Sequence, residues 1–391
     1  MPDGALACSD RVRLHYALAA LFAFAILTLW VPALWPVTVF QAGIFIVCIG
    51  ALWRYFPRRV PYPALPLLFA VGWGLLQLCF HLSAYPFATK TAVLRFATFL
   101  AVFTGAYCLM QDPHVRRWFR SAMLWFAFPV SIWATLQTFT SHGRVLWIFP
   151  TGYTDFVMGP IVYHNHWAAF VEVVLPFALY EAFRRSTNSL LYAGMAAALY
   201  ASVIASASRA GTVLATAEIV AVAMAMAARG IVTGRAVGAA CLRIFILFAT
   251  FTAVAGWTRV ADRLRMPDPM QGRRELDISS LHLIADHPFA GTGLGTWPTV
   301  YPRYAVIDIG VFANQAHDDW LQFTAEGGVP FGLVIFSLFL WSIRPAFRTV
   351  WGLGVISVFL HAAVDYPFSR PALGSWPILV IAMLAARQAE P

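Results

Sequence analysis

The stretch GTGLGTWPTVYPRYAVIDIGVFANQAHDDWLQFTAEGG, Gly291–Gly328, is a polar segment in an otherwise largely apolar chain. It carries a histidine with several acids and amides, and its upstream flank, from about Arg259, is rich in arginine and aspartate. Polar segments of this kind lie outside the lipid in membrane proteins, because hydrocarbon cannot solvate them. We interpret the stretch as the segment that carries the reactive residues in a protein with many membrane spans.

The composition of the 391 residues supports this class. Hydrophobic residues make up 60% of the chain and charged residues only 12%, whereas about a quarter of residues are charged in soluble domains. Apolar runs of roughly 18 to 25 residues recur, each long enough to cross a hydrocarbon core of ~30 Å. The net charge of +9 comes almost entirely from arginine. Basic cytoplasmic loops and anionic lipids explain such a balance, so we expect membrane lipids and no nucleic acid as partners.

The apolar runs predict an all-α integral membrane protein that forms a single polytopic domain over residues 1–391. The first run resembles a signal peptide, but no small-residue cleavage site follows it, so we expect a retained span. About twelve spans are expected, near residues 15–34, 37–53, 62–82, 89–110, 118–138, 159–182, 189–206, 210–228, 236–257, 325–343, 348–364 and 371–387.

The arginines of the short loops predict the orientation of these spans. With the N-terminus in the cytoplasm, one side collects Arg11, Arg13, Arg54, Arg58, Arg59, Arg116, Arg117, Arg120, Arg184, Arg185, Arg229, Arg235, Arg344, Arg348 and Arg387. Short loops on the other side hold few basic residues, which is the positive-inside pattern. Both termini are then cytoplasmic, and residues 258–324 form an extracytoplasmic helical cap loop that carries the active site.

The same topology gathers the remaining polar residues on the outer face. Besides the cap loop, this face holds His164, Asn165 and His166, then Arg209, and finally His361, Asp365 and Arg370. Titratable groups that converge from distant parts of a membrane protein favour a functional site.

His317 is the main candidate for proton transfer. It precedes Asp318 and is expected to open a helix, on the same face as Leu321 and Thr324. A histidine side chain exchanges protons near neutral pH and is the commonest general base. From the spacing alone, a capping or core histidine is equally compatible.

Arginines are the candidates for binding an anion. Arg209 lies between two apolar spans with almost no loop, where a guanidinium needs an anion, a water-filled cavity or the membrane interface. Arg273 and Arg274 precede a short amphipathic helix expected over Glu275–Asp286. These two could hold a diphosphate, or could pair with nearby acids.

Other polar positions are ambiguous. The Gly291, Gly293 and Gly295 pattern lacks the strand and helix of a dinucleotide site, so we expect a tight turn with close backbone approach. His361 and Asp365 are expected to share a helix face at i, i+4. With His164 and His166 they could form a metal site, although hydrogen bonding at a helix end fits better, since no metal-ligand spacing is present. Two acids inside spans, Glu172 and Glu218, could serve a proton relay or helix packing.

Several motifs together resemble the bacterial O-antigen ligase and polymerase superfamily. These are HPFAGTGLGTW at His287–Trp297, AHDDWLQFTAEGGVPFG at Ala316–Gly332, SASRAG at Ser206–Gly211, YHNHWAAF at the start of the sixth span, and HAAVDYPFSRPA at His361–Ala372. Each motif is weak alone, but their order and membrane side also match. One departure is Asp318, where family members commonly have asparagine.

The resemblance implies the all-helical architecture of lipid-sugar glycosyltransferases in a bacterial inner membrane. The donor would be an undecaprenyl-diphosphate-linked glycan at the periplasmic face, transferred with inversion and without metal or cofactor. His317 would activate the acceptor hydroxyl, and Arg209, also catalytic, would bind the diphosphate with Arg273 and Arg274. Secondary candidates are Asp318, Asp365, Arg370, His164 and Asn165. Aromatic residues of the cap, Trp297, Tyr301, Tyr304 and Trp320, would stack on sugars or form an interfacial belt.

The acceptor separates several versions of this function. Lipid A-core makes the protein a ligase, another lipid-linked repeat makes it a polymerase of O-antigen or exopolysaccharide, and a protein makes it an oligosaccharyltransferase. The chain ends soon after the last span, which disfavours the protein acceptor. Functions of other classes remain as alternatives, namely a membrane transporter, a flippase or a non-catalytic assembly partner. Transporters place their charged residues near the membrane midplane and often have two related halves. In this chain the charged residues gather on one face and the halves look unlike.

Overall fold

The computed structural model describes residues 3–57, 59–153, 156–184, 188–233, 272–306 and 312–388, with scattered positions between 235 and 250. Nearly all regular structure in this part is helical. The α-helices are α1 Asp3–Leu27, α2 Trp35–Tyr55, α3 Ala64–Cys79, α4 Pro86–Leu109, α5 Pro113–Thr140, α6 His164–Phe183, α7 Ser189–Ala205, α8 Arg209–Ala228, α11 Arg273–Asp286, α12 Trp297–Val300, α13 Asp319–Gly327, α14 Val329–Thr349, α15 Leu353–His361 and α16 Pro371–Gln388. Shorter elements are the paired strands β1 Arg144–Val145 and β2 Phe149–Pro150 and the 3₁₀ turns η1 Gly159–Ile161, η2 Tyr301–Arg303 and η3 Pro367–Ser369.

The expected membrane class is confirmed in its general form. Among the described residues, six helices are long and apolar enough to cross a membrane, namely α2, α4, α5, α6, α8 and α14. Shorter apolar helices occupy Arg13–Leu27, Ala64–Cys79 and Ser189–Ala205. The count of about twelve spans stays a prediction. The expected span 236–257 and the first part of the 258–324 loop lie largely outside the described residues.

Two expected spans are wrong in detail. The helix expected over 348–364 is α15, whose nine residues reach only about 14 Å, less than half of a hydrocarbon core. Gly354 presses α15 against the α6 backbone, where a Cβ atom would collide with the Glu172 carbonyl. The span expected over 325–343 breaks at Gly328, whose φ of 82° ends α13 and starts α14.

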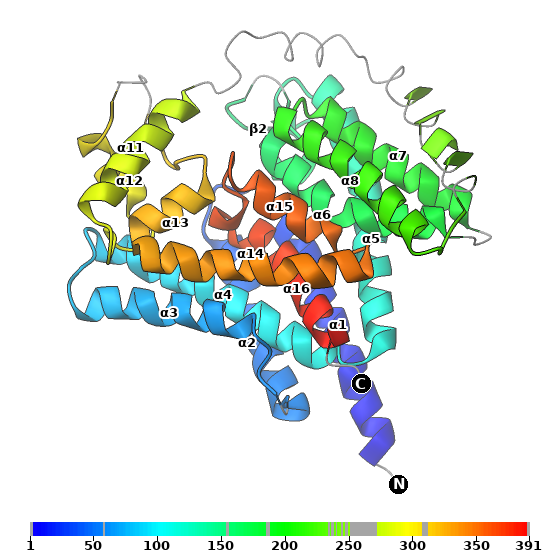
Figure 1. The fold of residues 1–391 in the computed structure, drawn as a ribbon, viewed down its shortest axis with the longest axis horizontal. Helices are drawn as coiled ribbons and strands as arrows, with labels where there is room; N and C mark the ends of the chain where they lie inside the picture. Colours follow the sequence, from blue (N-terminus) through cyan, green and yellow to red (C-terminus); the bar gives the residue numbers. More distant parts are fainter. Residues whose placement is uncertain are drawn as a thin grey trace.

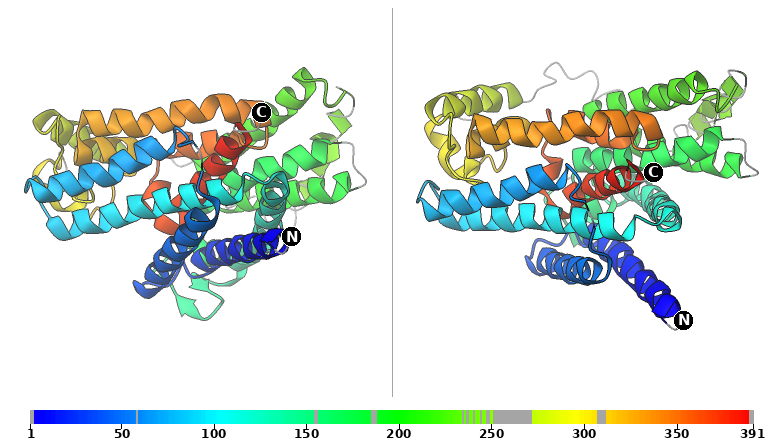
Figure 2. Two further views of the ribbon diagram at one scale, coloured as in Figure 1. Left: turned by 90° about the horizontal axis from the view of Figure 1, so that it is seen from below. Right: turned by 60° about the horizontal axis from the view of Figure 1, so that its bottom comes forward.

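Helix α6 forms the centre of the bundle. In its most apolar stretch 89% of the residues are buried inside the protein, against 33% for α8 and α14. Large apolar side chains on the outer helices face outward, as lipid contact requires, among them Ile46, Trp53, Val213, Met224 and Leu333. Helices α3, α4 and α14 run side by side in both views of Figure 2, and α11, α12 and α13 gather at one end of them in Figure 1.

The two ends of α6 differ in charge. At its C-terminal end, a pocket of about 320 Å³ is lined by Arg116, Arg117, Arg120, Arg184 and Arg387. Arg229 donates to the carbonyl of Arg348 over 2.6 Å. Loops that the sequence assigns to one side of the membrane therefore do meet in space.

The cap has a small core of its own. This core consists of packed side chains from α11, α12 and the turn after α12, namely Leu276, Leu283, Trp297 and Tyr301. Helices α11 and α12 are therefore packed against each other. The helix expected over Glu275–Asp286 is confirmed as α11, which starts two residues earlier.

The predicted glycine turn is confirmed as a site of close backbone approach. Gly291, Gly293 and Gly295 all have positive φ, at 65°, 107° and 78°, which costs glycine little. A Cβ atom at Gly293 would lie 2.8 Å from Ser83, and one at Gly295 would lie 2.8 Å from the Ala88 carbonyl oxygen. The turn is therefore pressed onto α4 and the residues just before it.

Candidate active site

Asp365 is the centre of the polar cluster at the N-terminal end of α6. Its Oδ1 lies 3.5 Å from Nδ1 of His317, and its Oδ2 lies 3.7 Å from Nε2 of His166. The carboxylate is fully buried, whereas the His317 side chain is 29% exposed. The aromatic ring of Tyr366 meets both imidazoles edge to face, with centroid distances of 4.8 and 4.6 Å. Two histidines thus share one buried carboxylate, and His317 is the one that reaches solvent.

His317 lies just before a helix and does not open one, contrary to the expectation. Helix α13 begins at Asp319, and Asp318 caps it by accepting a hydrogen bond from the Leu321 amide over 2.9 Å. His317 has a φ of 60°. For a residue other than glycine this left-handed backbone carries a cost that the surrounding contacts must offset.

Asp319 fixes this loop against the turn that carries Asp365. Its amide donates to the Ala362 carbonyl over 2.8 Å. Its carboxylate accepts from the Phe368 amide over 2.8 Å and from the Ser369 hydroxyl over 2.9 Å. Because Asp319 bonds on both sides of Asp365, it sets the distance between Asp365 and His317.

The electrostatic environment keeps Asp365 ionised. Burial alone would raise the pKa of this carboxyl. Burial is the largest single effect, but the contact with His317 and the nearby His166, His361 and Arg273 together outweigh it and lower the pKa to about 2. An ionised partner on Nδ1 orients an imidazole and stabilises its protonated form. His317 therefore has the orienting partner that a general base requires.

A second buried pair lies deeper in the bundle. His361, the last residue of α15, bonds through Nδ1 to Oε1 of Glu172 on α6 over 2.7 Å, and both side chains are fully buried. His361 and Asp365 do not share a helix face as expected, because α15 ends at His361 and Asp365 lies in the following turn. In the described part of the chain, no group of three or more His, Cys, Asp or Glu side chains is placed to hold a metal ion.

Arginines lie at the first position of two helices at this end. Arg209 opens α8 and Arg273 opens α11, while Arg274 beside it is exposed. Helix α8 starts next to the first turns of α6, since a Cβ atom on Gly211 would strike Ala168. Arg273 lies near enough to contribute to the low pKa of Asp365. A cation at a helix N-terminus opposes the helix dipole, at a cost of about 0.3–1 kcal/mol, so both positions favour an anionic ligand.

Glu326 and Gln77 hold the cap on the bundle. The Glu326 carboxylate accepts from the Gly295 amide over 2.7 Å and from the Trp297 amide over 3.3 Å. Gln77 on α3 donates to the carbonyls of Ala290 and Glu326 and accepts from the Leu294 amide. The glycine turn, α13 and α3 therefore form one connected unit.

Residues 193–337 match the family model described as O-antigen ligase. The match supports the O-antigen ligase and polymerase superfamily. The chain matches none of the curated proteins. The ligase-family match includes Arg209, Arg273 and His317 and ends before Asp365. The match implies glycosyltransferase-like chemistry on lipid-linked glycans and glycan acceptors in general.

The secondary candidates lie at different positions around the cluster. Asn165 donates to the Tyr163 hydroxyl over 3.0 Å and so supports the ring beside His166. His164 contacts the rings of Tyr163 and Phe156. Arg370 lies over the Tyr366 ring, with Cζ 5.9 Å from its centroid. Asp318 acts as an N-cap, and since asparagine caps helices equally well, its departure from the family pattern preserves the loop.

Sequence reasoning gave too little weight to some residues of the candidate site. His166 was considered as an outer-face residue and a metal alternative, and its Nε2 lies 3.7 Å from Asp365. Asp319 and Glu326 were given no role of their own, but both are buried and hydrogen-bonded. The spacing of Asp319 and Glu326 could have indicated a shared environment, since residues seven apart lie on one face of a helix.

The aromatic residues of the cap are structural. Trp297 is fully buried, stacks on Tyr301 and donates to the Ser280 hydroxyl. Trp320 donates to the Phe359 carbonyl among phenylalanine rings. The sugar-stacking role expected for Trp297 is therefore wrong, because its ring offers no accessible face.

Proposed function

We propose that the protein is a ligase that moves an undecaprenyl-diphosphate-linked glycan onto a hydroxyl of lipid A-core at the periplasmic face of the bacterial inner membrane. The observation that carries this proposal is the contact between His317 Nδ1 and Asp365 Oδ1. It occupies one ring nitrogen with an ionised, buried partner and leaves Nε2 of a partly exposed imidazole for a substrate. That arrangement is suited to removing a proton from a hydroxyl.

In the transfer step, one bond forms at the anomeric carbon, one bond breaks there, and His317 takes up the proton. The acceptor oxygen attacks the anomeric carbon of the glycan and gives its proton to Nε2 of His317. The bond from that carbon to the diphosphate oxygen breaks, and the diphosphate leaves with the electron pair. Attack opposite the leaving group inverts the anomeric centre. Asp365 stabilises the imidazolium that results, as a carboxylate does in hydrolase triads.

The departing diphosphate needs positive charge. Arg209 and Arg273 supply guanidinium groups at the N-terminal ends of α8 and α11, and Arg274 adds a third at the exposed surface. Planar guanidinium groups bind phosphate oxygens in pairs, and fixed donors at a leaving group are among the strongest catalytic effects. The charge balance supports a reaction that needs no metal cofactor.

Transfer in a reconstituted system tests the proposal and its metal independence together. Purified protein in liposomes with a lipid-linked donor and lipid A-core is expected to form ligated product at the same rate with and without EDTA. Product length separates the versions, because a polymerase extends the donor lipid itself when no lipid A-core is present. Loss of transfer in EDTA that Mg²⁺ or Mn²⁺ restores would contradict the arginine-based mechanism. Transport of the donor without transfer would favour a flippase.

Reporter fusions test the membrane orientation. A reporter that works only in the cytoplasm is expected to give signal when fused after Arg59, Arg185 or Arg348 and none when fused within Val260–Asn314. The physical reason is the arginine content of the short loops, which retains them on the cytoplasmic side. Signal from the cap loop would invert the topology and remove the site from the periplasmic substrate.

A further inference from the structure

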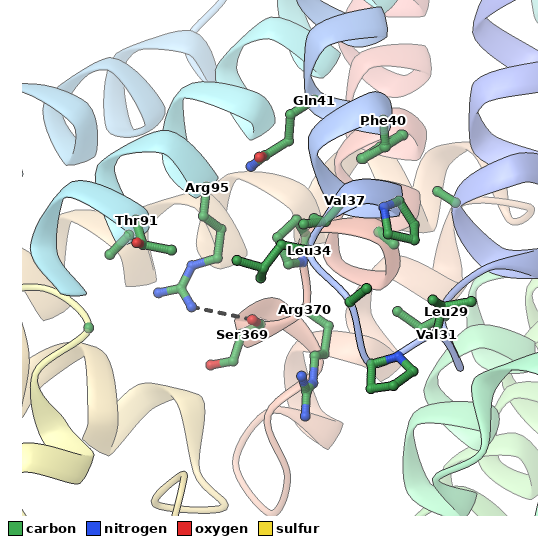
Figure 3. A pocket seen from close by; sticks show the side chains of 18 of the residues that line it. Leu29, Val31, Leu34, Val37, Phe40, Gln41, Thr91, Arg95, Ser369 and Arg370 are labelled. Atoms are coloured by element: carbon green, nitrogen blue, oxygen red, sulfur yellow. Dashed lines mark hydrogen bonds between the residues drawn. The ribbon is translucent and has the colours of Figure 1, made fainter. Parts of the chain in front are cut away.

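A cavity of about 640 Å³ lies beside the cap, and its lining includes Gly295 and Gln315 but neither Arg209 nor Arg273. Figure 3 shows it between the α1–α2 connection, the first turns of α4 and the turn before α16. One wall is apolar and comes from the connection and α2, with Leu29, Val31, Leu34, Val37 and Phe40. The opposite wall is polar and contains two arginines. The cavity is therefore amphipathic, with space for a ligand of substantial size.

Arg95 provides the polar wall with unsatisfied donors. Its side chain projects from α4 into the cavity and is only 9% exposed. Nη1 donates to the Ser369 carbonyl over a long 3.4 Å, while Nε and Nη2 are buried without a hydrogen-bond partner. A buried guanidinium with two unused donors is costly unless a ligand accepts from it.

Acids near Arg95 do not fill this role. Asp319 and Glu326 lie within electrostatic reach of its guanidinium, but hydrogen bonds from Phe368, Ser369, Gly295, Trp297 and Gln322 occupy their oxygens. Burial also raises the pKa of both carboxyls, which favours their neutral form. Among the described residues, no Asp or Glu lines the cavity itself, whereas Arg370 adds a second positive group.

The apolar wall continues to an outer rim. Leu34 is 75% exposed and Phe87 is 64% exposed, and both line the cavity. These side chains would meet acyl or isoprenoid chains of the surrounding lipid, since α2 and α4 are candidate membrane spans. A ligand that enters here presents hydrocarbon to the α1–α2 connection and its head group to Arg95.

We propose that this cavity binds a second lipid substrate, an amphiphile with a phosphate group on long hydrocarbon chains, and that this lipid is the glycan acceptor. The phosphate lies between Arg95 and Arg370. Gln315, two residues before His317, lines the same cavity, and Tyr366 separates Arg370 from the His317 ring. The acceptor thus approaches His317 from a cavity that neither Arg209 nor Arg273 lines. Its role as acceptor rests on the proposed function, but its binding does not.

Lipid binding tests the cavity without any transfer. Native mass spectrometry of the purified chain would measure retention of dioleoyl phosphatidic acid and of dioleoylglycerol, which has the same chains and no phosphate. We expect the phosphate lipid to bind at least about tenfold more tightly, in line with the strength of charge-assisted hydrogen bonds. Arg95→Gln should remove that preference, and Arg144→Gln, an exposed arginine outside the cavity, should retain it.

One stability measurement and one further variant keep the result interpretable. Arg95→Gln removes an incompletely bonded charge, so it should not lower the unfolding temperature. Val37→Trp should reduce binding by filling the apolar half. Equal binding of both lipids, or full binding by Arg95→Gln, would overturn the proposal. Parallel titrations with lipid A and undecaprenyl phosphate identify which phosphate lipid the cavity prefers.

The transfer assay separates the two proposals. If the cavity serves the acceptor, Arg95→Gln should raise the KM for the acceptor at least about tenfold and leave the KM for the donor unchanged. An unchanged acceptor KM with intact transfer would remove the acceptor role alone. Selective phosphate-lipid binding by a protein that transfers nothing would keep the cavity as a lipid site and remove the glycosyltransferase.

Discussion

Replacing His317 with alanine is expected to lower the rate of glycan transfer by about 10²–10⁴-fold, the usual contribution of one positioned base. The variant loses the group that accepts the proton but little packing, because the His317 side chain is partly exposed. Helix α13 keeps its Asp318 cap, so the loop should retain its shape. Transfer from a lipid-linked donor, measured at equal protein in membranes, gives the effect on kcat.

His282→Ala is the matched control for this experiment. His282 lies exposed on α11 in the same cap, and alanine suits a helix interior. This variant should transfer at the rate of the unmodified protein. Wild-type transfer by His317→Ala would remove the general base from the mechanism and leave His317 as a loop residue.

Arg209→Lys is expected to keep the positive charge and still lose transfer by about ten- to a hundredfold. An ammonium cannot make the paired hydrogen bonds of a guanidinium, and one charge-assisted bond is worth about 1.5–3 kcal/mol. Arg209→Ala should be at least as damaging. Both variants should weaken binding of the lipid-linked donor more than binding of the acceptor.

Arg303→Lys is the control for Arg209, because Arg303 is exposed in the cap. If Arg209 only reaches toward the membrane interface, lysine would replace it without loss, since both side chains extend a charged tip to the head groups. A fully active lysine variant would leave Arg273 and Arg274 to bind the diphosphate.

Hydropathy predicted most of the described helices, because it depends on the local sequence alone. Hydropathy failed at residues 348–364, where apolar content reflects the burial of the short helix α15 against α6. A hydrophobic run has the same composition in a protein interior and in a membrane. Gly352 and Gly354 indicated close packing at this segment, but a glycine in the sequence does not show which segment packs against it.

The candidate site was only partly predictable for a related reason. His317 and the arginines stood out as polar residues in an apolar chain. The pairing of His317 with Asp365, however, depends on Asp319 bonding to the turn at 362–369, a contact between segments that no periodicity relates. Arg95 was unremarkable in sequence because it lies within an apolar run, and its importance comes from the cavity beside it.

The pairing of α6 with the end of the chain has a consequence for biosynthesis. Glu172 enters the membrane early, while its partner His361 follows 189 residues later. Until that segment is made, the carboxyl of Glu172 lacks its native partner, a state that hydrocarbon disfavours. Newly synthesised α6 is therefore expected to stay in contact with water or protein until the segment that carries His361 has been inserted. A chain cut short before His361 should be recognised by quality-control proteases even though most of its apolar helices are complete.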